Sequence, residues 1–454
     1  MSERAEVPVT PYGGDREEAV RREAFREGRL PVAVYGLGKM GLPVASVFAE
    51  TTGAVTGVDV DESVVAGINA GECHVGNEPG LSELVASLVA DGSLRATADG
   101  AAAAEDARIH VIIVPTLVTE EDRPDTSVVT SVARDVAAGL SPGDLVCVES
   151  TLPPRTCRDV LGPLLRFESG LDDDEFGLAF CPERTKSGRA LADVRGTHPK
   201  VVGGIDEESG RAAALVYDEL TDAEVIPVSD ATTAEAVKVF EGLYRDVNIG
   251  LANELARFTD ELEIDVREAI DVANTQPYCD IHTPGPGVGG HCIPYYPYFV
   301  INWLETDAPL LSTARTVNDA TPAHVVGLLE GKLDERGRAL DGATVVVLGL
   351  TYRGGVAETR ASPAIDVCRE LDARGATVYA SDPLVDADGV PTTPVHHDDV
   401  GTIDADAVVL ATDHEEFRGI DWRAVPADAV ILDTHDALDA DRIGREVSVV
   451  GRHD

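Results

Sequence analysis

The sequence predicts an α/β protein with two Rossmann-like, doubly wound domains joined by a long central helix. Three observations lead to this fold class. Short apolar runs alternate with amphipathic segments from about residue 30 to 205, helical periodicity with few breakers covers 231–273, and the alternation restarts near Leu340. Strands that alternate with helices favour a parallel sheet with helices on both faces.

The same pattern divides the chain of 454 residues into parts. The polar start, with a helical stretch from Arg16 to Arg26, is expected to be a surface extension. A polar, acidic interruption at 166–175 is expected to be a loop. The expected parts are an N-terminal extension (1–29), a first Rossmann domain (30–215), a central helical region (216–335) and a second Rossmann-like domain (336–454).

Strands are expected at the short apolar, β-prone runs, because strands buried on both faces carry continuous apolar stretches. In the first domain these runs are Val32–Tyr35, Val55–Asp59, Ile109–Val114, Leu145–Glu149, Leu178–Cys181 and Lys200–Gly203. In the second they are Thr344–Gly349, Thr377–Ala380, Ala407–Ala411 and Ala429–Asp433. Helical patterns cover 231–273 and 309–336.

The chain is strongly acidic, with 81 Asp and Glu against 37 Lys and Arg and a formal net charge of −44. Such a surface repels nucleic acid and anionic membranes. Because the acids are spread along the whole chain, we expect a solvated surface suited to a salt-rich, halophilic cytoplasm, where salt screens the self-repulsion. Lysines number only five, so Lys238 in an apolar helical run is conspicuous.

The sequence also argues against a membrane span, a disulfide framework and a metal site. No apolar stretch is long enough to cross a membrane, and the start of the sequence has no signal-peptide apolar region. The seven cysteines show no C-x-x-C spacing, which argues against a disulfide framework or a metal site. We therefore expect a globular, cytoplasmic protein with no metal, nucleic-acid or membrane partner.

A glycine turn follows the first predicted strand. Gly36, Gly38 and Gly41 form G-x-G-x-x-G before a helical pattern, and the next strand ends at Asp59. The glycines allow a tight turn, a close approach of the backbone to a pyrophosphate and close helix packing, while the helix N-terminus faces the phosphate charge. Asp59 would accept hydrogen bonds from ribose hydroxyls and repel a 2′-phosphate, so the pattern predicts NAD as cofactor of the domain 30–215.

The run from Pro284 to Pro294 holds one cysteine in a loop rich in glycine and proline. Its sequence is Pro-Gly-Pro-Gly-Val-Gly-Gly-His-Cys-Ile-Pro, with Cys292 near the end. Glycines permit backbone angles that other residues avoid and let a ligand approach the main chain. A cysteine held this way can be presented as a nucleophile, although an arbitrary cysteine is more often buried as a small apolar residue.

Together these motifs resemble the UDP-glucose/GDP-mannose-type nucleotide-sugar 6-dehydrogenase family, which oxidises a nucleotide-linked hexose twice at C6. The resemblance runs from about Val32 through the cysteine loop to His435. The further matching motifs are Gly36-Leu37-Gly38-Lys39-Met40-Gly41-Leu42-Pro43, Val114-Pro115-Thr116, Glu149-Ser150-Thr151, Cys181-Pro182-Glu183-Arg184, Lys238, Tyr244-Arg245-Asp246-Val247-Asn248-Ile249 and Gly349-Leu350-Thr351-Tyr352-Arg353.

The resemblance implies a four-electron oxidation of a UDP-sugar alcohol to an acid, with two NAD. Cys292 would add to the aldehyde formed first, and the second oxidation would give a thioester that water hydrolyses. Lys238 would favour the thiolate and stabilise an alkoxide or oxyanion. Glu183 would activate water or act as general base, and Thr116 would position water or cofactor.

The resemblance also implies binding roles for further residues. Arg353 would contact the UDP part, Arg360 would reach the cofactor, and Arg245 and Asn248 would contact substrate, within one chain or across a dimer. The implied cofactor residues are Gly36, Gly38, Lys39, Met40, Gly41, Asp59, Thr116, Thr151 and Arg360. The implied substrate residues are Glu183, Arg184, Lys238, Arg245, Asn248, Gly289, His291 and Arg353.

The motif details resemble the branch of the family that acts on UDP-N-acetylhexosamines. Gly-Gly-His-Cys at 289–292 and Cys-Pro-Glu-Arg at 181–184 carry this likeness, and UDP-N-acetyl-D-mannosamine is the first choice of substrate. The family also implies a homodimer through the central helical region, UDP binding by the domain 336–454, and a uronic acid suited to surface polysaccharide biosynthesis.

Two positions depart from the family pattern. The family commonly has asparagine four residues after the lysine and aspartate four residues after the cysteine, where this chain has Gly242 and Tyr296. The departures leave open a catalytically impaired nucleotide-sugar-binding protein. Two further alternatives stay open, a UDP-glucose 6-dehydrogenase and a two-electron hydroxyacid dehydrogenase. The second Rossmann-like domain and the cysteine loop argue against the last.

Overall fold

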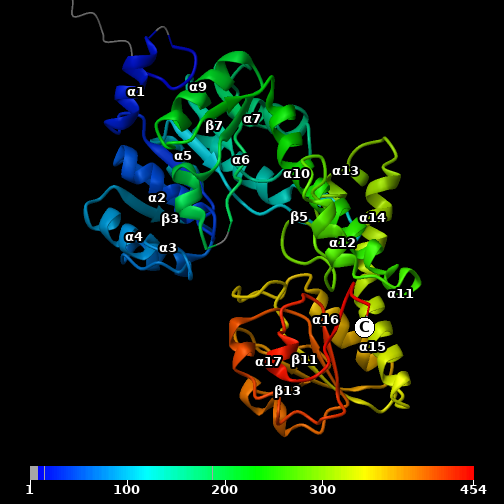
Figure 1. Cartoon of the computed structure of the whole chain (residues 1–454). Coiled ribbons are helices and arrows are strands. Elements are labelled where there is room, and N and C mark those ends of the chain that lie inside the picture. Colours follow the sequence, from blue (N-terminus) through cyan, green and yellow to red (C-terminus); the bar gives the residue numbers. More distant parts are fainter. Residues whose placement is uncertain (1–8, 15, 187, 454) are drawn as a thin grey trace, which may run out of the picture. The chain divides into compact units, whose positions relative to one another are not determined.

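The computed structural model describes residues 9–14, 16–186 and 188–453 (Figure 1). The chain divides into two compact units. Unit 1 spans Met1–Phe240 with Tyr298–Trp303, and unit 2 spans Glu241–Pro297 with Leu304–Asp454. Within the described ranges no helix has both the length and the apolar character needed to cross a membrane.

Unit 1 contains an eight-stranded sheet in the order β10-β9-β8-β7-β4-β1-β2-β3. All of its neighbouring strands run parallel except β8 and β9, which pair antiparallel. The expected strands are present, and β3 and β10 are additional. The bounds are β1 Val32–Tyr35, β2 Val55–Val58, β3 Leu94–Thr97, β4 Ile109–Ile112, β7 Leu145–Val148, β8 Gly177–Phe180, β9 Lys200–Gly204 and β10 Val225–Pro227.

Both faces of this sheet are covered. Along β1, Val32 and Val34 pack in one apolar cluster, while Ala33 and Tyr35 pack in another. This alternation is what a doubly wound sheet requires, because successive side chains point to opposite faces. The surrounding helices are α2 Gly41–Thr52, α3 Glu62–Asn69, α4 Leu81–Ala90, α5 Gly100–Asp106, α6 Ser127–Gly139, α7 Gly162–Ser169, α8 Ala190–Ala192, α9 Glu207–Asp218 and α13 Tyr298–Ile301. A small hairpin pairs β5 Leu117–Val118 with β6 Pro124–Asp125, and short π-helical turns lie at Cys157–Leu161 and Asp193–Thr197.

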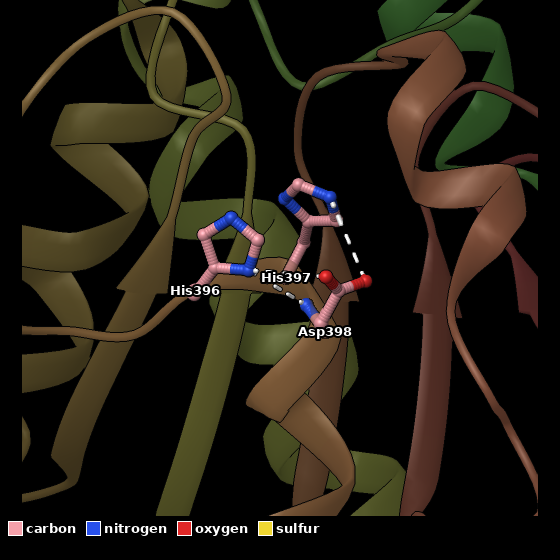
Figure 2. Close-up of side chains that lie close together, drawn as sticks. All are labelled: His396, His397 and Asp398. Atoms are coloured by element: carbon pink, nitrogen blue, oxygen red, sulfur yellow. Dashed lines mark hydrogen bonds and ion pairs between the residues drawn. The ribbon is translucent and has the colours of Figure 1, made fainter.

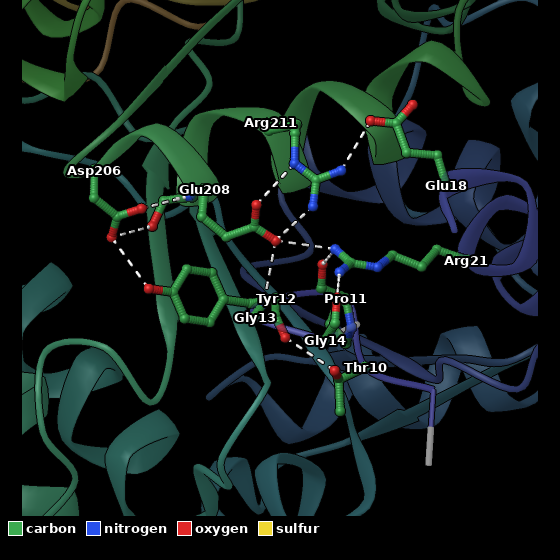
Figure 3. Close-up of polar contacts among 11 residues, drawn as sticks. Thr10, Pro11, Tyr12, Gly13, Gly14, Glu18, Arg21, Asp206, Glu208 and Arg211 are labelled. Atoms are coloured by element: carbon green, nitrogen blue, oxygen red, sulfur yellow. Dashed lines mark hydrogen bonds and ion pairs between the residues drawn. The ribbon is translucent and has the colours of Figure 1, made fainter. Parts of the chain in front are cut away.

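The segment before the first strand packs into unit 1, which differs from the surface extension expected for 1–29. Helix α1 (Glu18–Arg26) buries Arg21 and Phe25, whose relative exposures are 1% and 0%. The Arg21 guanidinium pairs with Glu208 of α9 at 3.0 Å, and Glu208 also accepts from Arg211 (Figure 3). The expectation is wrong for the described residues because an aromatic ring and a paired guanidinium anchor the helix; residues 1–8 lie outside the described ranges.

The predicted loop at 166–175 is only partly a loop. Residues up to Ser169 belong to α7, and the helix ends at Gly170, whose φ of +74° is left-handed. Gly170 therefore stops the helix without steric cost. The polar composition of this stretch fits a helix end that faces solvent, where even Phe167 is 83% exposed.

The long helical run at 231–273 forms three helices instead of one. Helix α10 covers Ala231–Ala256, α11 covers Thr259–Leu262 and α12 covers Val266–Ala273. The chain turns at Glu263, which has a φ of +55°, and Asp265 then caps α12 by accepting from the amides of Arg267 and Glu268. The run at 309–336 is likewise divided, into α14 Pro309–Asp319 and α15 Thr321–Glu335.

Unit 2 contains a six-stranded, all-parallel sheet in the order β13-β12-β11-β14-β15-β16. Along β11, alternate residues again pack in two apolar clusters, so this sheet is also covered on both faces. The two Rossmann-like sheets and the long helix α10 confirm the predicted fold class. The bounds are β11 Thr344–Leu348, β12 Thr377–Ser381, β13 Thr393–Pro394, β14 Ala407–Leu410, β15 Val430–Asp433 and β16 Ser448–Val449, with helices α16 Pro363–Ala373 and α17 Ala440–Ile443 and 3₁₀ turns at His397–Thr402 and Glu415–Gly419.

Candidate functional site

The glycine turn of unit 1 has the geometry of a phosphate cradle. Gly36 has a φ of +96°, and a β carbon on Gly41 would overlap the Gly36 carbonyl, so both positions require glycine. Around Gly38 a β carbon would meet nothing within 4 Å, which leaves open space for a ligand beside its backbone. Helix α2 begins at Gly41 with Met40 as the N-cap residue, and no side-chain oxygen of Met40 competes for the helix amides.

The acid at the end of β2 lies beside this turn. One carboxylate oxygen of Asp59 accepts from the Leu37 amide at 2.9 Å, and the other accepts from the Asp61 amide at 3.0 Å. The predicted acid and the glycine turn are therefore fixed to each other. At the end of β4, the Thr116 hydroxyl is buried and has no hydrogen-bond partner among the described residues. An orphaned hydroxyl at the carboxyl end of these strands fits a dinucleotide or a bound water.

Lys238 and Glu183 lie together in unit 1. The Lys238 ammonium donates to the Glu183 carbonyl oxygen and lies 3.9 Å from its carboxylate. Both side chains are largely buried, with exposures of 11% and 14%. The next residues join this pair to the glycine turn, because the Thr185 hydroxyl donates to the Met40 sulfur at 3.1 Å. The segment 183–185 thus links four predicted positions, Met40, Glu183, Arg184 and Lys238.

A pocket lined by Glu149, Glu183, Arg184, Lys200 and Tyr217 borders this segment. Glu149 is 2% exposed, pairs with Lys200 at 2.9 Å and accepts from the Tyr217 hydroxyl at 2.6 Å. Burial and the Glu149 charge raise the pKa of Tyr217 well above its usual value. Arg184 donates to the Pro199 carbonyl at 3.0 Å. No pattern in the sequence marks Lys200 of β9 and Tyr217 of α9 as part of this pocket.

The segment after Thr151 is held in place by a buried carboxylate, that of Glu235, which sequence reasoning missed. Glu235 of α10 is fully buried and accepts from the amides of Arg155 at 2.5 Å and Cys157 at 2.7 Å. Burial raises the pKa of Glu235 to about 7, against the opposing effect of these hydrogen bonds. Because Glu235 precedes Lys238 by about one helical turn, it fixes this segment to the part of α10 that carries the lysine.

In unit 2 the cysteine loop is held on the side that precedes Cys292. The Gly290 amide donates to the Arg360 carbonyl at 2.9 Å, and Gly290 has a φ of +95°. A β carbon on Gly290 would lie 2.9 Å from the Tyr352 ring, so the loop backbone packs directly on that ring. A β carbon on Gly289 would lie 2.7 Å from the Ala361 carbonyl oxygen. Cys292 itself is exposed.

Two charged residues of unit 2 flank this loop. The His291 imidazole pairs with the Glu358 carboxylate, which supports a binding or positioning contact and not a Cys–His catalytic pair. The Arg360 guanidinium lies 5.3 Å from the centre of the Tyr295 ring, within cation–π range. Arg360 was expected to reach the cofactor; within its own unit it stands beside the cysteine loop. Arg353, on the neighbouring segment, is exposed.

The two substrate residues expected on α10 differ in their surroundings. Arg245 is exposed. Asn248 is 9% exposed; its amide group donates to the Asp280 carbonyl at 2.5 Å and its oxygen accepts from the His282 amide at 2.8 Å. These contacts hold Asp280 and His282, just before the cysteine loop, against α10. Asn248 therefore fixes this segment within its own chain.

Arg267 of α12 is a second residue that sequence reasoning missed. Its guanidinium is buried, at 6% exposure of the residue, and donates to the carbonyls of Pro284, Thr434 and Val450 at 2.8, 3.0 and 2.7 Å. It therefore fixes the first residue of the Gly-Pro loop to the ends of β15 and β16. No pattern in the sequence distinguishes it from the other arginines of an amphipathic helix.

In the second Rossmann-like sheet, the turn after β11 is tied to the acid that follows β12. After β12, Asp382 accepts from the amides of Leu350 and Thr351 at 2.7 and 3.0 Å and pairs with the buried His414 at 3.2 Å. These hydrogen bonds hold the pKa of Asp382 below its usual value, although burial opposes them. The contact parallels that between Asp59 and the Leu37 amide in unit 1.

Among the described residues, one group of side chains has metal-ligand spacing: His396, His397 and Asp398 (Figure 2). His396 and Asp398 have side chains 61% and 71% exposed. The His396 Nδ1 already accepts from the Asp398 amide at 3.3 Å, and the two imidazoles stack at 4.1 Å. These contacts account for the cluster without an ion, and we assign no metal to it.

Family models match three successive parts of the chain. They are described as the NAD binding domain, the central domain and the UDP binding domain of the UDP-glucose/GDP-mannose dehydrogenase family, and they match residues 30–221, 232–320 and 346–440. The matched parts cover most of the 454 residues.

Individual proteins match over nearly the whole chain. A UDP-N-acetyl-D-mannosamine dehydrogenase from Pyrococcus horikoshii is 34% identical over 94% of this chain and 100% of its own length. An NDP-N-acetyl-D-galactosaminuronic acid dehydrogenase from Ralstonia nicotianae is 34% identical over 91% of this chain and 97% of its own.

Solved structures agree with these matches. The structure of the P. horikoshii UDP-D-ManNAc dehydrogenase has a TM-score of 0.83 at 33% identity and covers 94% of this chain and 100% of its own. A UDP-glucose dehydrogenase from Pyrobaculum islandicum has a TM-score of 0.82 at 26% identity, with coverages of 94% and 98%.

Proposed function

Because this chain belongs to the UDP-glucose/GDP-mannose dehydrogenase family, we propose that it oxidises a UDP-N-acetylhexosamine at C6 to the uronic acid, with NAD as oxidant. The first choice of substrate is UDP-N-acetyl-D-mannosamine. Both relatives at 34% identity are named for N-acetylated sugars, whereas the UDP-glucose dehydrogenase from P. islandicum is 26% identical. The observation that carries the proposal is the exposed Cys292 in a loop whose backbone is fixed.

The residues of unit 1 fit NAD. The open space at Gly38, the α2 amides at Gly41, the carboxylate of Asp59 and the orphaned Thr116 hydroxyl match its pyrophosphate, ribose and amide groups in kind. NAD supplies the acceptor for one hydride at each oxidation. Lys39, Thr151 and Arg360 remain proposed cofactor contacts. The Asp59 carboxylate would disfavour the 2′-phosphate of NADP.

In the proposed chemistry Cys292 is the nucleophile. After the first oxidation its thiolate adds to the C6 aldehyde, forming a C–S bond and a hemithioacetal alkoxide that is then protonated. Loss of the hydroxyl proton, together with loss of a second hydride from that carbon, gives a thioester. Water then adds to the thioester carbonyl, the C–S bond breaks, and the acid leaves with the thiol restored.

Lys238 and Glu183 have complementary proposed roles. The ammonium of Lys238 stabilises the negative oxygen on C6 that appears in the addition and hydrolysis steps. Glu183 accepts a proton from the attacking water. Their ion pair at 3.9 Å keeps a cation and an acceptor side by side in a largely buried place, as both roles require.

The proposed substrate contacts outside this pair follow the parts of the nucleotide sugar. Arg353 and the domain 336–454 bind the UDP portion; the matched UDP binding domain at 346–440 supports this. Arg184, Arg245, Asn248, Gly289 and His291 remain proposed contacts to the substrate or its surroundings.

We also propose that the protein is a homodimer. Phe240, Tyr244 and Leu251 of α10 are 58%, 50% and 46% exposed and follow one another at helical spacing. A second copy of the chain would cover these side chains. Light scattering at high salt should give twice the mass of 47.9 kDa, and a mass of one chain would contradict the dimer. With a net charge of −44, a salt-rich cytoplasm remains the proposed setting.

The substrate is tested by NADH formation at high salt with a panel of UDP-sugars. The proposal predicts turnover with UDP-N-acetyl-D-mannosamine and an acidic product. Turnover with UDP-glucose alone would assign the protein to the other substrate branch. Tight UDP-sugar binding with no NADH from any sugar would indicate an impaired binding protein.

A further inference from the structure

The two positions at which the sequence departs from the family pattern are in contact in unit 2. A β carbon built on Gly242 would overlap the Cδ2 atom of Tyr296 and lie 2.9 Å from its Cγ and Cε2 atoms. The aromatic ring thus occupies the space that any side chain at 242 would need. The two departures therefore form one structural change, in which the aromatic ring at 296 fills the space left by the missing side chain at 242.

The backbone of Tyr296 is tied to Cys292. The amides of Tyr296 and Tyr295 both donate to the Cys292 carbonyl, at 3.0 and 3.1 Å, which closes residues 292–296 into a single turn. Tyr296 itself is 7% exposed. A buried ring one turn after the cysteine therefore fixes the backbone that carries the thiol.

We propose that Tyr296, seated on Gly242, is a positioning residue for the Cys292 nucleophile. The loop is held before Cys292 by Gly290 on Arg360 and Tyr352, and after it by Tyr296 on α10. Between these two anchors Cys292 is exposed. This role rests on the proposed function, since it matters for turnover only if Cys292 is the nucleophile.

The first test does not depend on activity. Hydrogen–deuterium exchange of the peptide 292–299 is followed in the full-length protein at high salt. Tyr296→Ala and Gly242→Ala should each speed exchange of the Tyr295 and Tyr296 amides by at least about tenfold, because the first removes the ring and the second fills the space in which the ring lies. Tyr296→Phe keeps the ring and should match the wild type. Gly250→Ala is the control on the same helix, where a β carbon would meet Ala314 at an ordinary 3.4–3.6 Å.

The second test separates positioning from stability. With UDP-N-acetyl-D-mannosamine and NAD, Tyr296→Ala should lower kcat at least about tenfold and change KM less than about threefold, while Tyr296→Phe restores turnover. If Gly242→Ala does not fold, the double variant Gly242→Ala/Tyr296→Ala relieves the overlap and should recover the unfolding temperature. Unchanged exchange after ring removal, or faster exchange with unchanged kcat, would overturn the proposal. A wild type without turnover would overturn the proposed function instead, and the exchange result would still decide whether the ring anchors the turn.

Discussion

The ring of Tyr296 lies on the backbone of Gly242, in the space that a β carbon at 242 would occupy. This contact predicts that Gly242→Ala lowers the free energy of unfolding, which is the opposite of the usual effect of this substitution in a helix. In a helix with free space, replacing glycine by alanine stabilises by roughly 0.5–1 kcal/mol. At 242 the overlap with the ring should outweigh that gain, and we expect Gly242→Ala to destabilise by about 1–3 kcal/mol.

The control for this prediction is Gly327 of α15, where a β carbon would meet nothing within 4 Å. Gly327→Ala should raise the free energy of unfolding, measured by denaturant titration at constant high salt. Equal stabilisation by both substitutions would show that the ring does not occupy the position described.

Glu235 should make stability depend on pH. Burial raises its pKa from the ordinary value of 4.5 to about 7, so the folded protein binds the proton more tightly than the unfolded chain. The stabilisation is complete below pH 4.5 and is lost as pH rises to about 7, amounting to about 3 kcal/mol. We therefore expect the free energy of unfolding of the wild type, relative to Glu235→Gln, to fall over this range.

The matched control for Glu235→Gln is Glu254→Gln, because Glu254 is exposed on the same helix. Unfolding free energies of the three proteins are compared from pH 4.5 to 8 at one salt concentration. If the wild type and Glu235→Gln give parallel curves, the carboxylate does not carry the proposed shift.

Asp59 should set the choice between NAD and NADP. Its carboxylate is oriented by the amides of Leu37 and Asp61, which fix its charge beside the glycine turn. Asp59→Asn removes the charge, and we expect the ratio of kcat/KM for NAD over NADP to fall by at least about tenfold. Asp61→Asn alters a neighbouring acid that caps α3 and should leave the ratio unchanged. An unaltered ratio in Asp59→Asn would remove the residue from cofactor selection.

Cys292 should be needed for acid formation. We expect Cys292→Ser to reduce the yield of uronic acid per time by at least about 10³-fold, since a hydroxyl is a far weaker nucleophile. Cys279→Ser, at a half-buried cysteine of the same unit, should retain the wild-type rate. Product is measured by mass spectrometry. Acid formation by Cys292→Ser near the wild-type rate would exclude the thioester route.

Much of the fold was predictable because its signals are local. The runs Val32–Tyr35 and Val345–Leu348 are apolar throughout, as strands buried on both faces must be, and Gly36 follows the first of them in a turn that requires glycine. The antiparallel pairing of β8 with β9 and the weak strand β3 were not predictable, since pairing direction depends on distant contacts.

The helix ends and the contacts that support the candidate site were harder to predict from the sequence. Nothing in the periodicity of 231–273 marks the turn at Glu263, where a non-glycine residue adopts a left-handed conformation. The buried roles of Glu235 and Arg267 arise from partners far away in sequence. The contact between Gly242 and Tyr296 likewise joins residues that the sequence analysis treated as separate departures.

The most direct test of the proposed function is the stoichiometry of NADH formed per UDP-N-acetyl-D-mannosamine consumed by the wild type. A limiting amount of the sugar is converted to completion at high salt with excess NAD, and the product is identified. A four-electron oxidation through Cys292 predicts two NADH for each sugar and one uronic acid. One NADH with a released aldehyde, or no NADH from any UDP-sugar, would contradict it.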